Sequence, residues 1–554
     1  MKRRFTILFT VALVICIVNI LPTHGYAGLP EKIRVGLKFG TTSPITITAS
    51  SNTGGKIGLY TGTSFSPFID YTATDILTLK NDDSYHIQVG GSFFSYSSVM
   101  KEIELLKANG ALRMSFYPMF RGNWYICTGF YPSASLYIPN YLVLKNVYGS
   151  LKTVKYIKGT ENAVVISNAS KSLFSFDGNN YNTRIRIISE NPKGLPLMNL
   201  EKAQYRGNFE LYRLNGGNII LVNELKLEEY LYSVIPAEMP AGSPAQEGER
   251  LEALKVQALT ARTFAYNQVK ASRYTKYDFD TDDSTATQVY GGYTKVSGAV
   301  GEYANSNKAV DQTIGRILLY DNMPATSIFY HSNDAGYKEE SANVWKATIP
   351  YILSGPDEFT LRYGGKIKTW TGSFTGNSIS TTISGYIKGN AGIDVGTVEE
   401  IDVITRVASG RVTEMLVKGS ETNFLLKKEL CRTALKLDVS SQLFNFRTED
   451  TINVLYSSTT TSKSNLSDRA AKILQGGYFT RKFIADTYGM VDTDGRIFER
   501  LKILPSDSQT ITVDGKGTGH GLGMSQDGAM QMAKEGYNAK AIIDFYYPGV
   551  YMSD

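Results

Sequence analysis

Two segments that lie far apart in this sequence constrain its fold most. Residues 519–529 form a glycine-dense run, Gly-His-Gly-Leu-Gly-Met-Ser-Gln-Asp-Gly-Ala, which carries the last of four histidines. Some 280 residues earlier, Glu238 stands in an apolar stretch between Pro236 and Pro240, and a helical run follows at 251–264. Each short pattern alone is weak evidence for a fold. The order of the patterns along one chain is more informative.

The N-terminus is typical of a targeting segment. Three basic residues at 2–4 precede a mostly apolar stretch at 5–21, and small residues then suit cleavage after Ala27. The apolar stretch is also close to the ~17–25 residues that a membrane span needs, so residues 1–27 are either a signal peptide or an anchor. We expect an exported protein that is extracellular, in the cell wall, or anchored at the outer face of the membrane.

Charge and cysteine content exclude several classes of protein. The formal net charge of +6 falls to +3 without residues 1–27, which is too mild a basic excess to predict nucleic-acid binding. Cys127 and Cys431 then remain, so one disulfide is allowed in an exported chain but a disulfide framework is not. Neither cysteine stands in a metal-ligand spacing.

The distribution of apolar residues predicts an α+β fold that is rich in strands. Runs such as 401–407 and 412–417 alternate apolar and polar residues, which is typical of strands with one buried face. Helical runs are fewer, and the length suggests two to four domains. Residues 28–75 are predicted to form a strand-rich N-terminal segment.

Taken in order, the Glu238 segment, the 251–264 run and the 519–529 loop resemble the stage II sporulation protein D (SpoIID) family, which is related to the amidase-enhancer proteins. Sporulation members of that family are lytic transglycosylases that act on peptidoglycan. The resemblance implies a catalytic domain over residues 180–554, interrupted by an insertion at about 455–505.

A second, smaller resemblance concerns residues 76–150. An apolar run at 85–94, a helical stretch at about 98–109 and an aromatic-rich run at 124–131 predict strand, helix and strand. That order resembles the sporulation-related repeat, or SPOR module, which binds glycan strands stripped of their stem peptides. The alternative is a small α+β insert without a binding role.

Glu238 is the candidate catalytic residue. Its neighbours are apolar, and apolar packing raises the pKa of a carboxyl group because it penalises the charged form. A lytic transglycosylase can work with one such group, which protonates the leaving oxygen and then serves as the base. The resemblance assigns this role to the glutamate of the Glu-Met-Pro segment. The alternative is a solvated glutamate at the junction of a helix and a loop.

The helix after Glu238 is predicted to begin at a capping box, Ser243 to Gln246, with Pro244 at its first position. Gln257 and Arg262 lie off its apolar face, where they could hold sugar or orient Glu238; hydrogen bonding on the helix surface is the alternative. The narrow apolar face consists of Leu251, Leu254, Ala258, Ala261 and Ala265.

Two further segments resemble parts of the same family. Residues 287–292 match a strand near the substrate groove, and His331 and Ser332 match a His-Ser segment beside which some members bind zinc through cysteines. This chain has no cysteine between Cys127 and Cys431, so we expect no zinc and no other cofactor. His331 is either a substrate contact or a buried, hydrogen-bonded histidine.

The C-terminal loop supplies the remaining candidate substrate contacts. Gly521 and Gly523 permit backbone conformations that other residues avoid, and they could let substrate approach the backbone. His520 and Gln526 offer hydrogen bonds to sugar hydroxyl or acetamido groups, and Ser525, directly before Gln526, is a further candidate contact that leads into the next helix. The loop lacks the Gly-Lys-Ser/Thr ending of a phosphate-binding P-loop.

Three functions are compatible with these patterns. The first is an exported lytic transglycosylase that cleaves peptide-stripped glycan strands, leaves 1,6-anhydro-N-acetylmuramic acid ends and works beside other sporulation wall hydrolases. The second is a non-catalytic amidase enhancer, and the third is a wall-binding protein of the spore envelope. Glu238 together with His331, Gln257 and the 519–529 loop favours the first, although the same residues could shape the scaffold alone.

Overall fold

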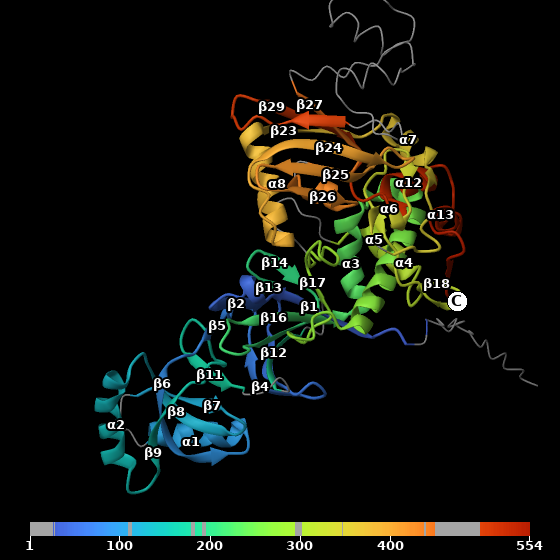
Figure 1. Ribbon diagram of the computed structural model, residues 1–554. Helices are drawn as coiled ribbons and strands as arrows, with labels where there is room; N and C mark the ends of the chain where they lie inside the picture. The colour runs from blue at the N-terminus through green and yellow to red at the C-terminus, as the bar shows by residue number, and fades with distance from the viewer. Residues whose placement is uncertain are drawn as a thin grey trace, which may run out of the picture.

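The computed structural model describes residues 26, 28–108, 114–178, 183–190, 195–293, 302–345, 347–436, 439–448 and 499–554. Except for Tyr26, the predicted signal or anchor segment lies outside these residues, and so does most of the predicted insertion. The fold is α+β and rich in strands, which confirms the expected class (Figure 1). Among the described helices, none combines the length and the apolar character that a bilayer crossing requires.

A seven-stranded sheet supports the helical part of the molecule. On one face of its strand β1, Ile33, Val35 and Leu37 alternate into the core, as the two-residue period of a strand requires. On the sheet's other face, Glu210 is buried and paired with arginines, including Arg34 at 2.7 Å. The strand order is β17 (Thr281–Asp282), β1 (Lys32–Lys38), β16 (Ile220–Lys226), β15 (Asn208–Tyr212), β12 (Arg184–Ser189), β3 (Gly55–Tyr60) and β4 (Phe65–Tyr71).

A ten-stranded sheet continues away from the helices. The strands of the predicted 28–75 segment are divided between the two sheets, so that segment pairs with residues up to 282 rather than with itself alone. The strand order is β14 (Ala203–Tyr205), β13 (Met198–Leu200), β2 (Thr46–Ser51), β5 (Leu77–Asn81), β10 (Ala163–Ser167), β11 (Ser172–Asp177), β7 (Phe116–Phe120), β8 (Trp124–Tyr131), β6 (Tyr85–Phe93) and β9 (Val154–Lys158).

The far end of that sheet holds the strand–helix–strand pattern expected within 76–150. Helix α1 (Tyr96–Ala108) buries Val99, Ile103 and Leu106, as its spacing predicts. A second helix, α2 (Ala134–Tyr148), and β9 extend the pattern to βαββαβ with strand order β7-β8-β6-β9. Sequence analysis missed α2 because its apolar residues follow no single helical face.

The helical part of the molecule is built around α4 (Glu247–Ala271). The expected capping box is present in a short 3₁₀ turn, where the Ser243 amide donates to Gln246 Oε1 at 3.1 Å. The expectation of a narrow buried face is wrong, because neighbouring helices pack around α4 and bury Gln257 and Arg262 as well. These neighbours are α3 (Leu227–Glu238), α5 (Ala304–Asp311), α12 (Gln526–Lys534) and α13 (Ala539–Tyr546).

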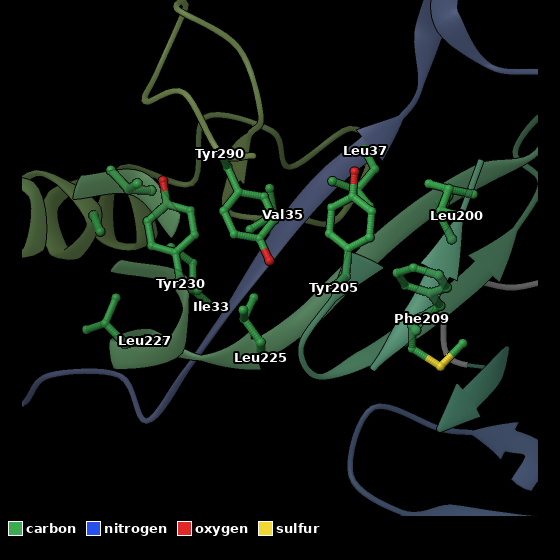
Figure 2. Close-up of a cluster of buried hydrophobic side chains, with 14 of the residues drawn as sticks. Ile33, Val35, Leu37, Leu200, Tyr205, Phe209, Leu225, Leu227, Tyr230 and Tyr290 are labelled. Atoms are coloured by element: carbon green, nitrogen blue, oxygen red, sulfur yellow. The ribbon is translucent and has the colours of Figure 1, made fainter. Parts of the chain in front are cut away.

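Apolar side chains of the first sheet hold α3 in place. Figure 2 shows Tyr230 of α3 beside Tyr290, whose ring centroid lies 5.2 Å away, above the row formed by Ile33, Val35 and Leu225. All five side chains are buried. The helix that ends at Glu238 is therefore fixed at its base by packing.

A second unit has a hydrophobic core of its own, which includes Ile401 and Val417. One of its strands, which pairs with residues 400–403, begins at residue 499, so the end of the predicted insertion belongs to this unit. Its elements are β23 (Thr369–Thr375), α8 (Gly376–Ala391), β24 (Val398–Arg406), β25 (Val412–Gly419), β26 (Asn423–Lys427), α9 (Leu430–Thr433), β27 (Phe444–Thr448), β28 (Glu499–Lys502) and β29 (Thr510–Lys516).

The segments before and after the second unit in the chain contain short elements. They are β18 (Leu318–Tyr320), β19 (Met323–Pro324), β20 (Tyr330–His331), β21 (Tyr337–Lys338), α6 (Ser341–Val344), β22 (Gly355–Pro356), α7 (Glu358–Arg362), β30 (Met524–Ser525) and β31 (Tyr551–Met552).

Candidate active site

Glu238 is the last residue of α3, with Pro236 inside the helix and Pro240 just beyond it. Its carboxylate accepts a hydrogen bond from the Val289 amide at 2.9 Å. Burial raises the pKa of Glu238, and the hydrogen bonds from Val289 and from the Tyr330 hydroxyl oppose that rise in part. A partly exposed carboxyl group with a raised pKa can deliver a proton, which is the chemistry expected of Glu238.

A chain of polar side chains backs the carboxylate. The Tyr230 hydroxyl donates to Gln288 Oε1 at 3.2 Å, and Gln288 Nε2 donates to the Tyr330 hydroxyl at 3.4 Å. Gln288 and Val289 belong to the 287–292 segment, which was expected to be a strand. It instead forms an extended stretch outside the sheets, and this leaves the Val289 amide free to reach Glu238.

A parallel pair of short strands brings the C-terminal loop to this site. Tyr330 lies opposite Met524 and His331 lies opposite Ser525, in strands β20 and β30. Sequence analysis did not single out Tyr330, although it precedes His331 directly. The signal in the sequence was its position next to His331. Its contact with Glu238 depends on the pairing of β20 with β30.

The glycines of the loop adopt the expected backbone conformations. Gly521 has φ +80° and Gly523 has φ +68°, values that favour glycine. However, the space that a Cβ would need is filled by this chain: Arg411 Nη2 would stand 2.2 Å from it at Gly521 and the Phe329 carbonyl oxygen 2.2 Å at Gly523. The glycines therefore allow close packing of the protein on itself at these two positions.

The rings of His331, which is buried, and His520, which is partly buried, lie next to each other, with centroids 5.5 Å apart and planes tilted by 57°. His331 Nδ1 lies 3.1 Å from the Leu522 carbonyl oxygen, and the Leu522 amide donates to His520 Nδ1 at 3.0 Å. Burial lowers the pKa of both rings, helped by nearby Arg411, and that of His520 falls to about 3. His331 is thus the buried, hydrogen-bonded histidine that was one of its two expected roles.

A partly exposed polar group lies next to this pair. Ser332 Oγ is 3.5 Å from Lys368 Nζ, and the Ser332 carbonyl accepts from the Asp527 amide. Asn333 Nδ2 donates to Asp527 Oδ2 at 2.8 Å, while burial raises the pKa of Asp527. Ser332 keeps a surface position from which a sugar hydroxyl could be bound. Lys368 was missed, because it comes from the second unit.

The other predicted contacts have protein partners. Arg262 is fully buried, and its guanidinium binds Glu228 and the Arg316 carbonyl. Gln526 Nε2 donates to Gln257 Oε1 at 3.4 Å, and Ser525 Oγ caps α12 by accepting from the Gly528 amide. These contacts place Gln257, Arg262 and Ser525 in the interior, where they brace the helices behind Glu238.

The residues near His331 do not form a zinc site. Asp334 Oδ2 lies 4.0 Å from His331 Nε2, and both atoms lack a hydrogen-bond partner among the described residues. Over the described ranges, no group of three or more His, Cys, Asp or Glu side chains could hold a metal ion. Cys127 and Cys431 are buried free thiols. One histidine and one carboxylate fall short of the four ligands of structural zinc.

Residues 215–320, which contain Glu238, α4 and part of the polar chain behind the carboxylate, match the family model described as "Stage II sporulation protein". Residues 360–460, most of the second unit, match a domain of unknown function.

Curated relatives cover much of the chain. It is 30% identical to the amidase enhancer of Bacillus subtilis over 371 residues, which are 67% of this chain and 47% of that protein. The chain thus spans about half the length of this relative. It is 26% identical to stage II sporulation protein D of Bacillus subtilis over 60% of this chain and 76% of that protein. An uncharacterized protein of Brachyspira hyodysenteriae is 27% identical over 66% of this chain and 76% of its own length.

Proposed function

Because the chain belongs to the SpoIID family of cell-wall proteins, we propose that it is a peptidoglycan lytic transglycosylase with Glu238 as its catalytic acid. The observation that carries the proposal is the environment of Glu238. Its carboxyl group has a raised pKa, ends a firmly packed helix and is held by the Val289 amide. The substrate is the glycan strand, most simply one without stem peptides.

The proposed reaction has two steps. Glu238 protonates the oxygen that links N-acetylmuramic acid to N-acetylglucosamine, and the bond from that oxygen to the anomeric carbon breaks. The Glu238 carboxylate then takes the proton of the muramic 6-hydroxyl, whose oxygen bonds to the anomeric carbon and closes the 1,6-anhydro ring. Glu238 is protonated again at the end, so one carboxyl group suffices. An intramolecular nucleophile reacts with an effective molarity of roughly 10⁵ M or more when well oriented.

Tyr330 and Val289 would have a positioning role. Their hydrogen bonds favour the charged form of Glu238, so they stabilise the carboxylate that must act as base in the second step. Burial favours the neutral form that must act as acid in the first. The balance of these opposing effects suits one group that alternates between the two forms.

The second candidate function is an accessory role without cleavage. It is favoured by the similarity to a protein named amidase enhancer, at higher identity than to the sporulation protein. In that case Glu238 would serve the scaffold, and the βαββαβ unit at 85–158 would bind wall glycan. We retain the SPOR-like glycan-binding role of this unit as a prediction in either case.

Purified protein incubated with peptide-stripped glycan tests the proposal. Glu238→Gln should lower turnover by at least ~10²-fold, because a neutral amide cannot donate or accept the proton. It should leave glycan binding intact, since the amide preserves the shape of the side chain. Glu229→Gln, on the same helix, is the matched control and should keep normal turnover.

Product mass separates the proposed reaction from hydrolysis. A 1,6-anhydro end is one water lighter than a reducing end, and we expect anhydro ends to dominate. Mainly reducing ends would indicate a hydrolase with a second carboxylate, for which Asp527 and Asp514 are the candidates beside the glycine loop. Normal turnover by Glu238→Gln would remove Glu238 as the acid, and inactivity of the wild type would favour the accessory role.

A further inference from the structure

Helix α2 (Ala134–Tyr148) has apolar residues around its whole circumference. Tyr137, Leu144 and Tyr148 are buried against the sheet. A helix that is apolar all round is ordinarily buried in a core or in a membrane. Here many apolar side chains on the helix, and on the turn after it, have large exposed fractions: Leu136 56%, Ile138 46%, Leu142 52%, Val143 43%, Val147 38% and Leu151 82%.

No described element covers this exposed α2 surface. The helix packs on β6, β8 and β9 alone among the elements with more than marginal contact. Figure 1 shows it at the outer edge of the molecule, at the end opposite the helices that surround α4. Large contiguous apolar patches on exported proteins mark contacts with other molecules.

Tyrosines line the base of the exposed surface. Tyr156 of β9 stacks on Tyr137 with ring centroids 5.1 Å apart, and Tyr141 lies 6.4 Å from the same ring of Tyr156. Tyr85 packs against Tyr137 at 5.7 Å. Tyrosine is enriched where a membrane meets water, because its ring is apolar and its hydroxyl stays hydrated.

The charge around the surface is basic. Residues 121–160 contain no acidic side chain. Lys145 and Lys158 are exposed and lie over the rings of Tyr141 and Tyr85. Lys152 is paired with Glu102 at 2.5 Å and adds no net charge. Exposed aliphatic side chains, tyrosines beneath them and flanking lysines are each favoured where an anionic bilayer meets water.

We propose that the exposed α2 surface docks on a bilayer of anionic phospholipid. The aliphatic side chains would enter the acyl region, the tyrosines would lie at the headgroups, and Lys145 and Lys158 would bind phosphate. Anionic wall polymers share the phosphate chemistry but offer no apolar phase for six aliphatic side chains. The proposal is independent of the reaction at Glu238.

The test uses the full chain with Cys16→Ser and one added cysteine that carries an environment-sensitive fluorophore. Leu142→Cys places the label on α2, and Leu353→Cys, 50% exposed in the helical part, is the matched control. With phosphatidylglycerol vesicles, the label at 142 should shift to the blue and be quenched by brominated acyl chains, while the label at 353 should not. A local label reports on α2 whether or not residues 1–27 also bind the membrane.

Lys145→Gln with Lys158→Gln should raise the lipid concentration for half-maximal quenching about tenfold, because each lysine contributes to binding at an anionic surface. Equal quenching on neutral phosphatidylcholine would overturn the role of the lysines. No quenching at 142, or an equal blue shift with purified wall polymer, would overturn the lipid assignment. A label that is already shielded without lipid would also overturn the lipid assignment. Shielding that grows with protein concentration would mean that a second copy covers α2, and shielding that does not grow would mean that another segment of this chain covers it.

Discussion

Helices α4 and α2 depart from the ordinary relation between polarity and burial in opposite directions. In α4, Gln257 and Arg262 are polar and completely buried. In α2, Leu142 and Val147 are apolar and exposed. Buried polar groups must find hydrogen-bond partners inside the protein. Exposed apolar groups contribute little to the free energy of folding, because they contact water in the unfolded chain as well. The first arrangement indicates a site fixed from within, and the second indicates a surface that awaits a partner.

The largest effect should come from the buried arginine of α4. Arg262→Met leaves Glu228 and the carbonyls around it without their hydrogen-bond donor. We therefore expect the free energy of unfolding to fall by about 3–5 kcal/mol. Chemical denaturation measures this free energy. Lys270→Met, exposed on the same helix, should change it by less than about 0.5 kcal/mol. Equal effects would show that α4 is not internally braced.

Helix α2 offers a contrast within one helix. Leu144→Ala removes a buried side chain and should cost about 2–5 kcal/mol, while Leu142→Ala should be nearly neutral, since its side chain is 52% exposed. Thermal unfolding in the absence of lipid measures both. A large loss from Leu142→Ala would mean that its side chain is covered by the protein itself, which would contradict the comparison.

His331, which is buried, and His520, which is partly buried, should make stability depend on pH. Their folded-state pKa values are lowered, so the unfolded chain binds more protons below its own histidine pKa of about 6.5. Stability is therefore present above that pH and is lost as the pH falls, by at most about 2 kcal/mol per histidine between pH 7 and 5. His520→Asn keeps an acceptor for the Leu522 amide and should reduce the slope. An unchanged slope would contradict a lowered pKa of His520 in the folded state.

The smallest expected effect is a shift in the pH dependence of activity that the protonation of Glu238 produces. A general acid must be protonated, so kcat/KM should fall as the pH rises through its pKa. The Tyr330 hydroxyl lowers that pKa, so Tyr330→Phe should move the falling limb to higher pH. Tyr290→Phe loses a buried hydroxyl that bonds to Asn223 and should leave the limb in place. A downward shift would reverse the role given to Tyr330.

Local patterns predicted much of the fold. The α+β class, α1 and the capping box at Ser243 each follow from short-range spacing and are confirmed. The sequence could not predict that α4 is surrounded, because burial of Gln257 and Arg262 depends on helices from distant segments. Nor could it predict α2, whose apolar residues lack a single face.

Part of the candidate site could be predicted from short-range patterns as well. The apolar neighbours of Glu238 pointed to a raised pKa, and burial does raise it. Tyr330 and Lys368 were missed, because a strand pairing and a separate unit bring them to the site. The glycines at 521 and 523 were recognised as conformationally special, but the Arg411 and Phe329 atoms packed against them become evident only in three dimensions.

The pairing of β20 with β30 also sets a time order for the formation of the candidate site. Met524 follows Glu238 by 286 positions, and β31 pairs with β18 in the helical part. A chain made from its N-terminus presents Glu238 early, yet Tyr330 receives its strand partner only when residue 524 has been made. Pairing between segments so far apart in sequence is slow to form. The polar chain behind Glu238 is therefore complete only after the C-terminal loop has joined the fold.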